Sequence, residues 1–365
     1  MNSNQKISVC IPSYNHEKTI GYTIESILNQ TYQNFELIIS DDNSTDKTIE
    51  VAKSFQDTRI KIIENKINSG VSVNSNIAIK NANGSYISLI ASDDIMLPTR
   101  LEKSINFLEN NPEFMVVIGF VETIDESNNI INHGMKKVFN QDVEPENILK
   151  KLFYNGNFLC APSATIKKSV FDNIGYFNNC LLQLQDFDFW IRILVNNYKI
   201  KILPEPLIQY RVSSNNLSAI EKPLTKQMAA KINFEYSYIL NNFLSVNNLE
   251  LANSFLDLSD YTVIDKKYLH FYLAKESLKI SNKMPFYIAN SYKNFALNLF
   301  SNMLNNQDLG QDLCNKFAFI ISDFYKIYQD NHIMNLIDNS HYNKRKNIFQ
   351  RLKRSYYKRI GKTQC

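Results

Sequence analysis

Hydrophobic residues in the first 110 positions follow two spacings that alternate along the chain. Short runs rich in β-branched residues, ISVCIP at 7–12 and FELIIS at 35–40, predict buried strands. The segment IGYTIESIL at 20–28 returns an apolar residue every three or four positions, which predicts an amphipathic helix. The runs IKIIE at 60–64 and YISLI at 86–90 extend the alternation. Strands separated by single helices predict βαβ units and a mostly parallel sheet flanked by helices.

The pattern becomes less regular after residue 110. A long apolar run at 114–125 and the segments at 199–204 and 207–218 predict further strands, and 185–195 predicts an amphipathic helix. From about residue 221 the spacing is helical throughout. We therefore expect an α/β domain at 1–220, with halves at about 1–110 and 111–220. A helical C-terminal region at 221–365 should follow it and end in a basic amphipathic tail at about 342–360.

Polar side chains follow each of the first four predicted strands. Pro12 and Tyr14 follow the first strand, Asp41-Asp42 the second, Asn68 to Gly70 the third, and Asp93-Asp94 the fourth. Turns and helix caps favour such residues, so each group alone has a purely structural explanation. The carboxyl ends of parallel strands meet at one edge, however, and such edges bind ligands. The coincidence of all four groups predicts a binding site there.

The pair Asp93-Asp94 raises a problem of charge. Two adjacent carboxylates at the end of a buried run repel each other unless a positive charge compensates them. A bound divalent cation would do so, because Mg²⁺ and Mn²⁺ prefer such oxygen ligands. The alternative is a doubled helix cap before Pro98.

Composition narrows the class of protein. The chain has 365 residues and a formal net charge of +4, too small for the whole chain to capture nucleic acid electrostatically. The five cysteines are scattered and show no CxxC spacing, which favours a reducing compartment over a disulfide framework or zinc site. No secretion signal precedes the first strand, and no run of about 18 apolar residues occurs. We expect a cytoplasmic protein.

The basic tail qualifies that expectation. Eight Lys and Arg residues between positions 344 and 359 interleave with apolar and aromatic residues. Such a helix can lie on an anionic membrane surface, which would make the protein peripheral on the inner face of the cell membrane. The alternative is a solvated helix that packs on its own domain. No aromatic platform supports RNA binding, so no nucleic-acid partner is expected.

The polar motifs together resemble a known family. ISVCIPSYN, ISDDNSTDKT, NSGVSVNSN, GSYISLIASDD and QDFDFWIRI occur in this order across about residues 6–215. They resemble the family 2 glycosyltransferases of the glycosyltransferase-A fold, a Rossmann-like, mostly parallel sheet flanked by helices. The resemblance implies an inverting enzyme that moves a sugar from a nucleoside-diphosphate sugar, expected to be a UDP-sugar. The implied acceptor is a hydroxyl of a glycan or polyprenyl-linked glycan in bacterial surface polysaccharide or glycoconjugate synthesis.

The resemblance also implies roles for the residues at the strand ends. Asp94 matches the position that binds the divalent metal, Mn²⁺ or Mg²⁺, and Asp93 the position that lies against the ribose and the metal. Pro12 and Tyr14 match the loop against the nucleobase, and Asp42 the residue that hydrogen-bonds the base.

Further roles fall on the segment QDFDFW. Asp186 matches the catalytic base, which takes a proton from the acceptor hydroxyl, although Gln185 replaces the usual preceding Glu. Asp188 is interpreted as structural. Trp190 is expected either to stack on an acceptor sugar or to pack in the core. Arg211 is expected either to reach the diphosphate or to pair with a surface acid.

Three other functions fit the pattern less well. A nucleotidyltransferase of similar fold usually carries a glycine-rich phosphate loop after the first strand, but PSYNHEKT at 12–19 has no glycine. A dinucleotide-dependent oxidoreductase would need GxGxxG in that place. A non-catalytic sugar-nucleotide-binding protein would not need Asp186, whose presence argues against this function.

Overall fold

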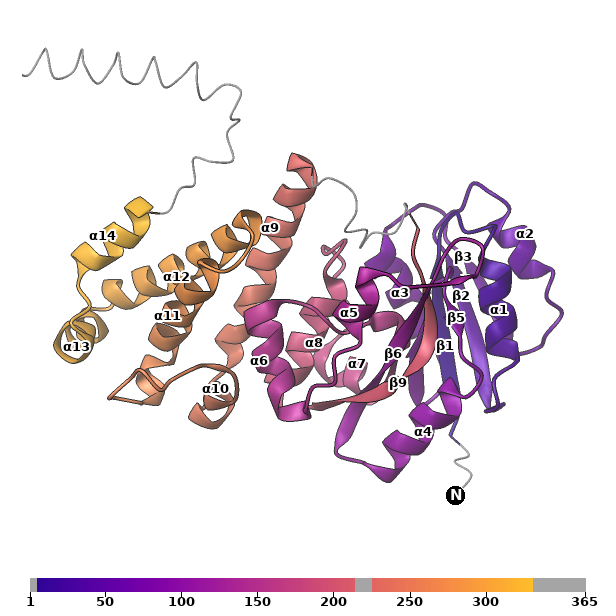
Figure 1. The fold of residues 1–365 in the computed structure, drawn as a ribbon, viewed down its shortest axis with the longest axis horizontal. Helices are drawn as coiled ribbons and strands as arrows, with labels where there is room; N and C mark the ends of the chain where they lie inside the picture. The colour runs from indigo at the N-terminus through magenta and orange to yellow at the C-terminus, as the bar shows by residue number, and fades with distance from the viewer. Residues whose placement is uncertain (1–4, 214–224, 331–365) are drawn as a thin grey trace, which may run out of the picture. The chain divides into compact units, whose positions relative to one another are not determined.

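The computed structural model of the protein describes residues 5–213 and 225–330 (Figure 1). The predicted basic tail at about 342–360 lies outside this part of the chain, as does the end of the segment predicted as a strand at 207–218. The described helices include none that is long and apolar enough to cross a membrane.

Nine strands of the described chain form one mixed sheet, in the order β3-β2-β1-β4-β8-β6-β9-β5 with β7 paired to β6. The strands are β1 Ile7–Ser13, β2 Phe35–Asp41, β3 Ile60–Glu64, β4 Tyr86–Leu89, β5 Ile95–Met96, β6 Phe114–Ile124, β7 Ile130–Ile131, β8 Ala164–Lys167 and β9 Lys199–Arg211. Strands β1 to β4 pair in parallel, as the alternation of strands and helices predicts. Strands β6 and β9 also pair in parallel, along the longest ladder of the sheet. The sheet is mixed because the shorter ladders of β8 with β4 and β6, of β5 with β9 and of β7 with β6 are antiparallel.

Strand β9 differs from the two separate strands that the sequence predicts. It runs without interruption from Lys199 to Arg211 beside β6, in parallel, but its register shifts where Gly119 faces Leu203 and Phe120 faces Pro206. The two residues between Leu203 and Pro206 therefore form a bulge. Proline cannot donate to a strand ladder, so Pro204 and Pro206 are compatible with the strand only at such an irregularity.

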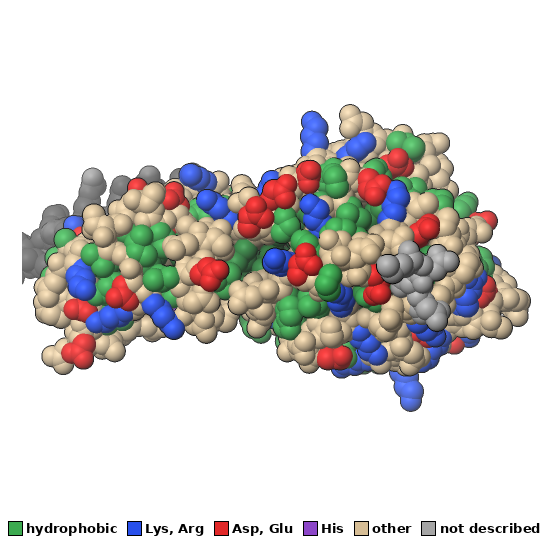
Figure 2. Space-filling model, turned by 90° about the horizontal axis from the view of Figure 1, so that it is seen from below, with side chains coloured by type: hydrophobic (Ala, Val, Ile, Leu, Met, Phe, Trp, Pro, Cys, Tyr) green, Lys and Arg blue, Asp and Glu red, His purple; other side chains and the backbone are tan. Residues whose placement is uncertain are grey.

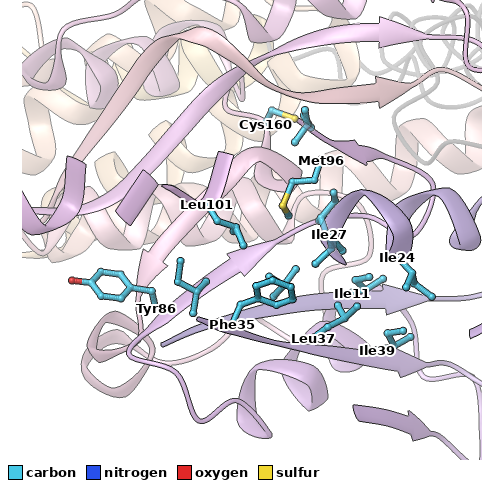
Figure 3. Close-up of a cluster of buried hydrophobic side chains, with 14 of the residues drawn as sticks. Ile11, Ile24, Ile27, Phe35, Leu37, Ile39, Tyr86, Met96, Leu101 and Cys160 are labelled. Atoms are coloured by element: carbon cyan, nitrogen blue, oxygen red, sulfur yellow. The ribbon is translucent and has the colours of Figure 1, made fainter. Parts of the chain in front are cut away.

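Helices cover the sheet. The helices that alternate with the strands along the chain are α1 Ile20–Leu28, α2 Thr48–Lys53, α3 Val71–Lys80, α4 Arg100–Asn110, α5 Gly134–Phe139, α6 Pro145–Asn155, α7 Ser169–Ile174 and α8 Gln185–Val195. Ile24 and Ile27 of α1 lie against Ile11, Leu37 and Ile39 of β1 and β2, all fully buried (Figure 3). Burial of each such side chain contributes roughly 1.5–3 kcal/mol, which explains why the apolar spacing predicts these elements correctly.

The C-terminal region is helical, as predicted. Its described part contains α9 Lys226–Leu240, α10 Leu249–Phe255, α11 Leu269–Ser281, α12 Phe286–Asn305, α13 Gln307–Phe317 and α14 Ile321–Asp330, with short 3₁₀ turns η2 Asn241–Ser245 and η3 Lys266–Tyr268. A third 3₁₀ turn, η1 Ala161–Ser163, precedes β8 in the sheet domain. By contacts, the chain divides into compact units at Met1–Phe295 and Ala296–Cys365. This division by contacts does not test the boundary predicted near residue 220 between the catalytic domain and the helical region, which stays a prediction.

An aromatic cluster joins α6 to η2, to α10 and to the part of α12 that belongs to the same compact unit as the sheet. Phe153 of α6 contacts Phe243 of η2 at 4.8 Å between ring centroids, Phe255 of α10 at 5.4 Å, and Tyr292 of α12 at 5.9 Å. Tyr292 also donates a hydrogen bond from Oη to the Phe153 carbonyl oxygen at 2.5 Å.

Acidic and basic side chains are interspersed on the face shown in Figure 2, in keeping with the small net charge.

Candidate active site

The ends of β1, β2 and β3 meet at one edge, as the sequence predicts. The Asp42 N–H donates to the Ser13 carbonyl oxygen at 2.8 Å, and the Asn65 N–H donates to the Asp41 carbonyl oxygen at 2.9 Å. Asn74 of α3 donates from Nδ2 to the same Ser13 oxygen at 3.2 Å. These bonds fix the loops that follow the strands, so the polar groups at this edge form one assembly.

Asp42 is buried and its carboxylate already has donors. Ser69 donates its N–H to both oxygens at 3.0 Å and its hydroxyl to Oδ1 at 2.8 Å. The Gly70 N–H donates to Oδ2 at 2.7 Å, and Asn65 Nδ2 to Oδ1 at 3.3 Å. A carboxylate offers about four lone-pair sites, so the loop between β3 and α3 occupies them. Asp42 therefore holds this loop in place, whatever else it contacts when a nucleotide is present.

Pro12 and Tyr14 lie at the end of β1. Pro12 is half-buried opposite Ser40 of β2, and the Tyr14 side chain is 42% exposed. Asn15, with φ of 53°, turns the chain there and accepts a hydrogen bond at Oδ1 from the Thr45 N–H at 2.8 Å. The exposed ring of Tyr14 is thus presented beside the loop that follows β2. This placement is compatible with the predicted contact to a nucleobase, which stays a prediction.

Asp94 has one oxygen that the described protein leaves without a partner. Its side chain is 1% exposed, and Oδ1 accepts a hydrogen bond from the Arg211 N–H at 2.8 Å, while Oδ2 has no donor. Burial raises the pKa of Asp94 well above its usual value, and the neighbouring charge of Asp93 raises it further. Burial also raises the pKa of Asp93, against the opposing charges of His16 and Arg211.

Two buried arginines and one histidine lie near Asp93 and Asp94, and their charges favour the ionised form of these carboxyl groups. Arg211 donates from Nε to the Asp93 carbonyl oxygen at 2.7 Å and from Nη1 to the Asp125 carbonyl oxygen at 2.7 Å, so it fixes the turn through main-chain atoms. Arg100, fully buried, donates to the Leu89 carbonyl oxygen at 2.6 Å, and burial lowers its pKa to about 9. His16 Nδ1 lies 2.5 Å from Ser92 Oγ.

Arg100 and His16 have no role in the sequence predictions. Arg100 opens a helix and therefore has the pattern of a solvated residue, and a histidine in a turn gives no distinctive spacing.

The acidic pair fits a divalent cation held jointly with a ligand. The described residues contain no cluster of three His, Cys, Asp or Glu that could hold an ion by themselves. Mg²⁺ sites commonly use one or two carboxylates and complete their coordination with substrate phosphates and water. The unpartnered Oδ2 of Asp94 beside Asp93 matches that donor set.

Asp186 lies in the first turn of α8 and is half-buried. Its Oδ1 accepts a hydrogen bond from the Phe187 N–H at 2.8 Å, and its Oδ2 accepts one from Asn157 Nδ2 at 2.9 Å. Burial raises the pKa of Asp186 to about 6. A carboxyl group with this pKa is ionised at neutral pH yet basic enough to take a proton, as general-base catalysis requires. Sequence reasoning missed Asn157, because a lone Asn after a helix reads as a turn residue.

Asp188 and Trp190 point into the protein. Asp188 accepts hydrogen bonds from Arg192 Nε and Asn242 Nδ2, both at 2.8 Å, and so joins α8 to η2, which agrees with a structural role. Trp190 is fully buried and packs on Phe189, with ring centroids 5.7 Å apart. Of the two alternatives that the sequence leaves open for Trp190, the structure agrees with packing in the core, because the inward face of α8 buries the indole.

The predicted site residues thus fall into two groups. Pro12 lies near the end of β1, and Tyr14, Asp42, Asp93 and Asp94 lie on loops at the same strand edge, whereas Asp186 lies on α8. The groups are linked through the loop that Asp42 holds. A Cβ atom at Gly70 would lie 3.5 Å from Leu182, four residues before Asp186, and the Ser72 hydroxyl contacts the Leu181 carbonyl oxygen.

Comparison with known proteins gives consistent matches. The family described as Glycosyl transferase family 2 matches residues 8–175. An uncharacterised glycosyltransferase of Methanocaldococcus jannaschii is 37% identical over 222 residues, which cover 59% of this chain and 74% of that protein. The UDP-Glc:alpha-D-GlcNAc-diphosphoundecaprenol beta-1,3-glucosyltransferase WfgD of Escherichia coli is 33% identical over 217 residues, which cover 58% of this chain and 79% of that protein.

Solved structures share the fold. Crystal structures of S. aureus TarS 1-349 match with a TM-score of 0.56 at 19% identity, over 89% of this chain and 88% of that chain. The same protein in complex with UDP-GlcNAc matches with a TM-score of 0.55 at 18% identity, over 80% of each chain. At this identity the likeness concerns the fold alone. It agrees with the mixed sheet, the flanking helices and the helical region after them.

Proposed function

The chain belongs to the family 2 glycosyltransferases, and from this membership we propose that it moves a sugar from a UDP-sugar to a hydroxyl of a lipid-linked glycan. The observation that carries the proposal is the half-buried carboxyl of Asp186, with a pKa raised to about 6, near the loop that Asp42 organises. The names of two relatives support the substrates, since both are UDP-Glc:alpha-D-GlcNAc-diphosphoundecaprenol beta-1,3-glucosyltransferases of Escherichia coli. UDP-glucose is accordingly the first donor to test.

In the proposed reaction Asp186 is the general base. The acceptor oxygen forms a bond to the anomeric carbon as its proton passes to the Asp186 carboxylate, and the bond from that carbon to the UDP oxygen breaks. One displacement inverts the anomeric centre. Asn157 and the Phe187 N–H, which donate to the carboxylate, hold its oxygens in a defined orientation. Because a positioned base contributes typically 10²–10⁴-fold, its orientation accounts for a large part of the rate.

On the donor side we assign the metal to Asp94, through the unpartnered Oδ2, with Asp93 beside it. A bound Mn²⁺ or Mg²⁺ would neutralise the diphosphate charge. Arg211 is better suited to position the turn of Asp93 than to contact the diphosphate, because its guanidinium donates to Asp93, Asp125 and Asn128. Asp42 and the exposed Tyr14 stay assigned to the base. Contact between Asp42 and a base would replace one of the donors from the loop between β3 and α3.

We also propose that the tail at about 342–360 brings the enzyme to the cytoplasmic face of a membrane, where a polyprenyl-linked acceptor would reside. Eight Lys and Arg residues support this, each worth roughly 1 kcal/mol near an anionic surface. Truncation before residue 342 should release the protein from phosphatidylserine vesicles and leave transfer to a soluble acceptor unchanged. Equal vesicle binding by the truncated and full chains would contradict the proposal.

The test of the function uses the full chain, UDP-glucose and α-D-GlcNAc-diphosphoundecaprenol, with Mn²⁺, Mg²⁺ or a chelator. UDP release and the mass of the lipid product are followed, and UDP-GlcNAc and GDP-mannose serve as alternative donors. We expect product only with a UDP-sugar, and a β configuration at the new linkage by NMR. Binding of UDP without transfer to any glycan or lipid-linked glycan would support a non-catalytic binder instead.

A further inference from the structure

A buried carboxylate on α9 accepts hydrogen bonds from the main chain just before Asp186. Glu235 is 2% exposed, and its oxygens accept hydrogen bonds from the N–H groups of Leu182 at 2.9 Å, Gln183 at 3.1 Å and Leu184 at 2.8 Å. Leu184 directly precedes α8, whose second residue is Asp186. Three hydrogen bonds to one ionised acceptor are stronger than neutral ones, so they fix the segment 182–184 firmly.

Tyr236, the next residue of α9, contacts the residue that follows Asp186 and the chain before Asn157. The Tyr236 ring packs edge-on against Phe187, with centroids 5.4 Å apart. Its hydroxyl lies against Gly156, where an added Cβ atom would come within 2.7 Å. Gly156, with φ of 84°, directly precedes Asn157, the residue that donates to the Asp186 carboxylate. Two consecutive residues of α9 therefore touch the segment before Asp186, the residue after it, and the chain that carries its hydrogen-bond donor.

Glu235 and Tyr236 lie outside residues 8–175, the part of the chain that matches the family. We propose that Glu235 is a positioning residue for Asp186, so that α9, outside the matched residues 8–175 and past the boundary predicted near residue 220, is part of the active site. The inference rests on the proposed role of Asp186 as the base. Because misplacement of a reacting group by about 1 Å can cost roughly 10²-fold, a helix that fixes Asp186 from both sides controls the rate directly.

The charge of Glu235 adds a second, measurable effect. Burial is the main reason for the raised pKa of Asp186, and the nearby negative charge of Glu235 raises it further. Cys160, also buried, interacts electrostatically with Asp186 as well. The raised pKa of its thiol keeps Cys160 neutral. A neutral residue at position 235 should therefore lower the pKa of Asp186.

Glu235→Gln tests the proposal, with UDP-glucose as donor and α-D-GlcNAc-diphosphoundecaprenol as acceptor. We expect kcat to fall by about 10- to 100-fold, while the affinity for UDP, measured by calorimetry, stays unchanged. The acid limb of kcat/KM should move to lower pH. Glu235→Asp keeps the charge and should leave the acid limb near its wild-type position while kcat still falls, because the shorter side chain reaches the three N–H groups less well.

Glu276→Gln is the matched control. Glu276 is also a buried glutamate of the C-terminal helices, 1% exposed, but its partners are Tyr154, which donates a hydrogen bond from Oη, and Lys279, which forms an ion pair with it at 2.8 Å. It should lower Tm without moving kcat or the acid limb.

Wild-type kcat and an unmoved acid limb in Glu235→Gln, or an equal fall in kcat for Glu276→Gln, would overturn the inference. If Glu235→Gln does not fold, Glu235→Asp decides by its kcat. Full activity of Asp186→Asn would instead overturn the proposed base, so the two failures are distinguishable.

Discussion

The strand edge and the N-terminus of α8 each hold a buried or half-buried acid, but they are built differently. At the strand edge, the donors to Asp42 come from one loop, 65–70, which follows the neighbouring strand. At α8, the chain that holds Asp186 is fixed by Asn157, 29 residues before it, and Glu235, 49 residues after it. The first arrangement follows from the parallel pairing of β2 with β3, which brings the ends of the two strands together, whereas the second depends on the packing of helices against one another.

The acids of the two regions also differ in how many of their carboxylate oxygens lack a hydrogen-bond partner or are exposed. Asp42 accepts from four different donor groups of its own chain, so its hydrogen-bonding capacity is already satisfied. Asp94 keeps Oδ2 without a partner, and Asp186 keeps part of its surface exposed. This difference supports the proposed roles, in which Asp42 organises the loop on the nucleotide side, Asp94 would bind a cation, and Asp186 would accept a proton.

The largest effect expected is on the chemical step at Asp186. Asp186→Asn keeps the shape but cannot take a proton, so transfer should fall by about 10²–10⁴ at saturating donor with nearly normal UDP binding. Asp188→Asn loses a buried ion pair with Arg192 and should cost stability more than catalysis. The two variants are compared by kcat and Tm. An inactive Asp188→Asn beside an active Asp186→Asn would exchange the two roles.

Asp94→Asn should come next in size. Loss of one carboxylate that stabilises a leaving diphosphate should lower kcat by about 10²–10³, and the Mn²⁺ concentration needed for half-maximal rate should rise. The fold should persist, because an amide oxygen can still accept from the Arg211 N–H and the variant removes one of two adjacent negative charges. Turnover with unchanged metal dependence would refute the metal site.

Asp42→Ala should act on binding rather than on chemistry. A lost hydrogen bond to a charged group is worth roughly 1.5–3 kcal/mol, so UDP affinity should fall about ten- to a hundredfold. Asp41→Asn is the control, since Asp41 is equally buried but accepts from Ser44 N–H and Oγ instead. Calorimetry of UDP binding measures both. Equal losses for the two variants would mean that Asp42 only shapes the loop.

The smallest effect concerns stability and pH. The pKa of Asp186 in the folded protein, about 6, lies above its usual value of about 3.8, so the folded state binds more protons between these values. Stability from this group is therefore full below the lower value and is lost as pH rises through 6. Tm of Asp186→Asn relative to wild type should increase by a few degrees from pH 5 to pH 8. A constant difference would show that the pKa is not raised.

The sequence predicts the strand edge well for a physical reason. Apolar runs end where burial ends, and parallel strands bring those ends together, so Asp42 and Asp94 could be placed from spacing alone. The same reasoning treats Pro204 as the end of a strand, although a bulge carries β9 past it. It also leaves Trp190 undecided, because the face of α8 that is buried depends on what packs against it.

The partners of Asp186 could not be predicted for a related reason. Glu235 lies in a helical pattern in which a Glu ordinarily faces solvent, and nothing in its spacing shows that it turns inward toward residues 182–184. Arg100 presents the same difficulty at the strand edge. Buried charged groups are determined by tertiary packing, which a periodic pattern does not report.

The most direct test of Asp186 as the base is the pH dependence of kcat/KM for the acceptor, which reports ionisation of the free enzyme. For the wild type, with UDP-glucose as donor, kcat/KM should rise about tenfold per pH unit below a pKa of about 6 and level off above it. The residual activity of Asp186→Asn should lack this limb. A wild-type profile that is flat from pH 4.5 to 8, or a limb that persists in Asp186→Asn, would contradict the account.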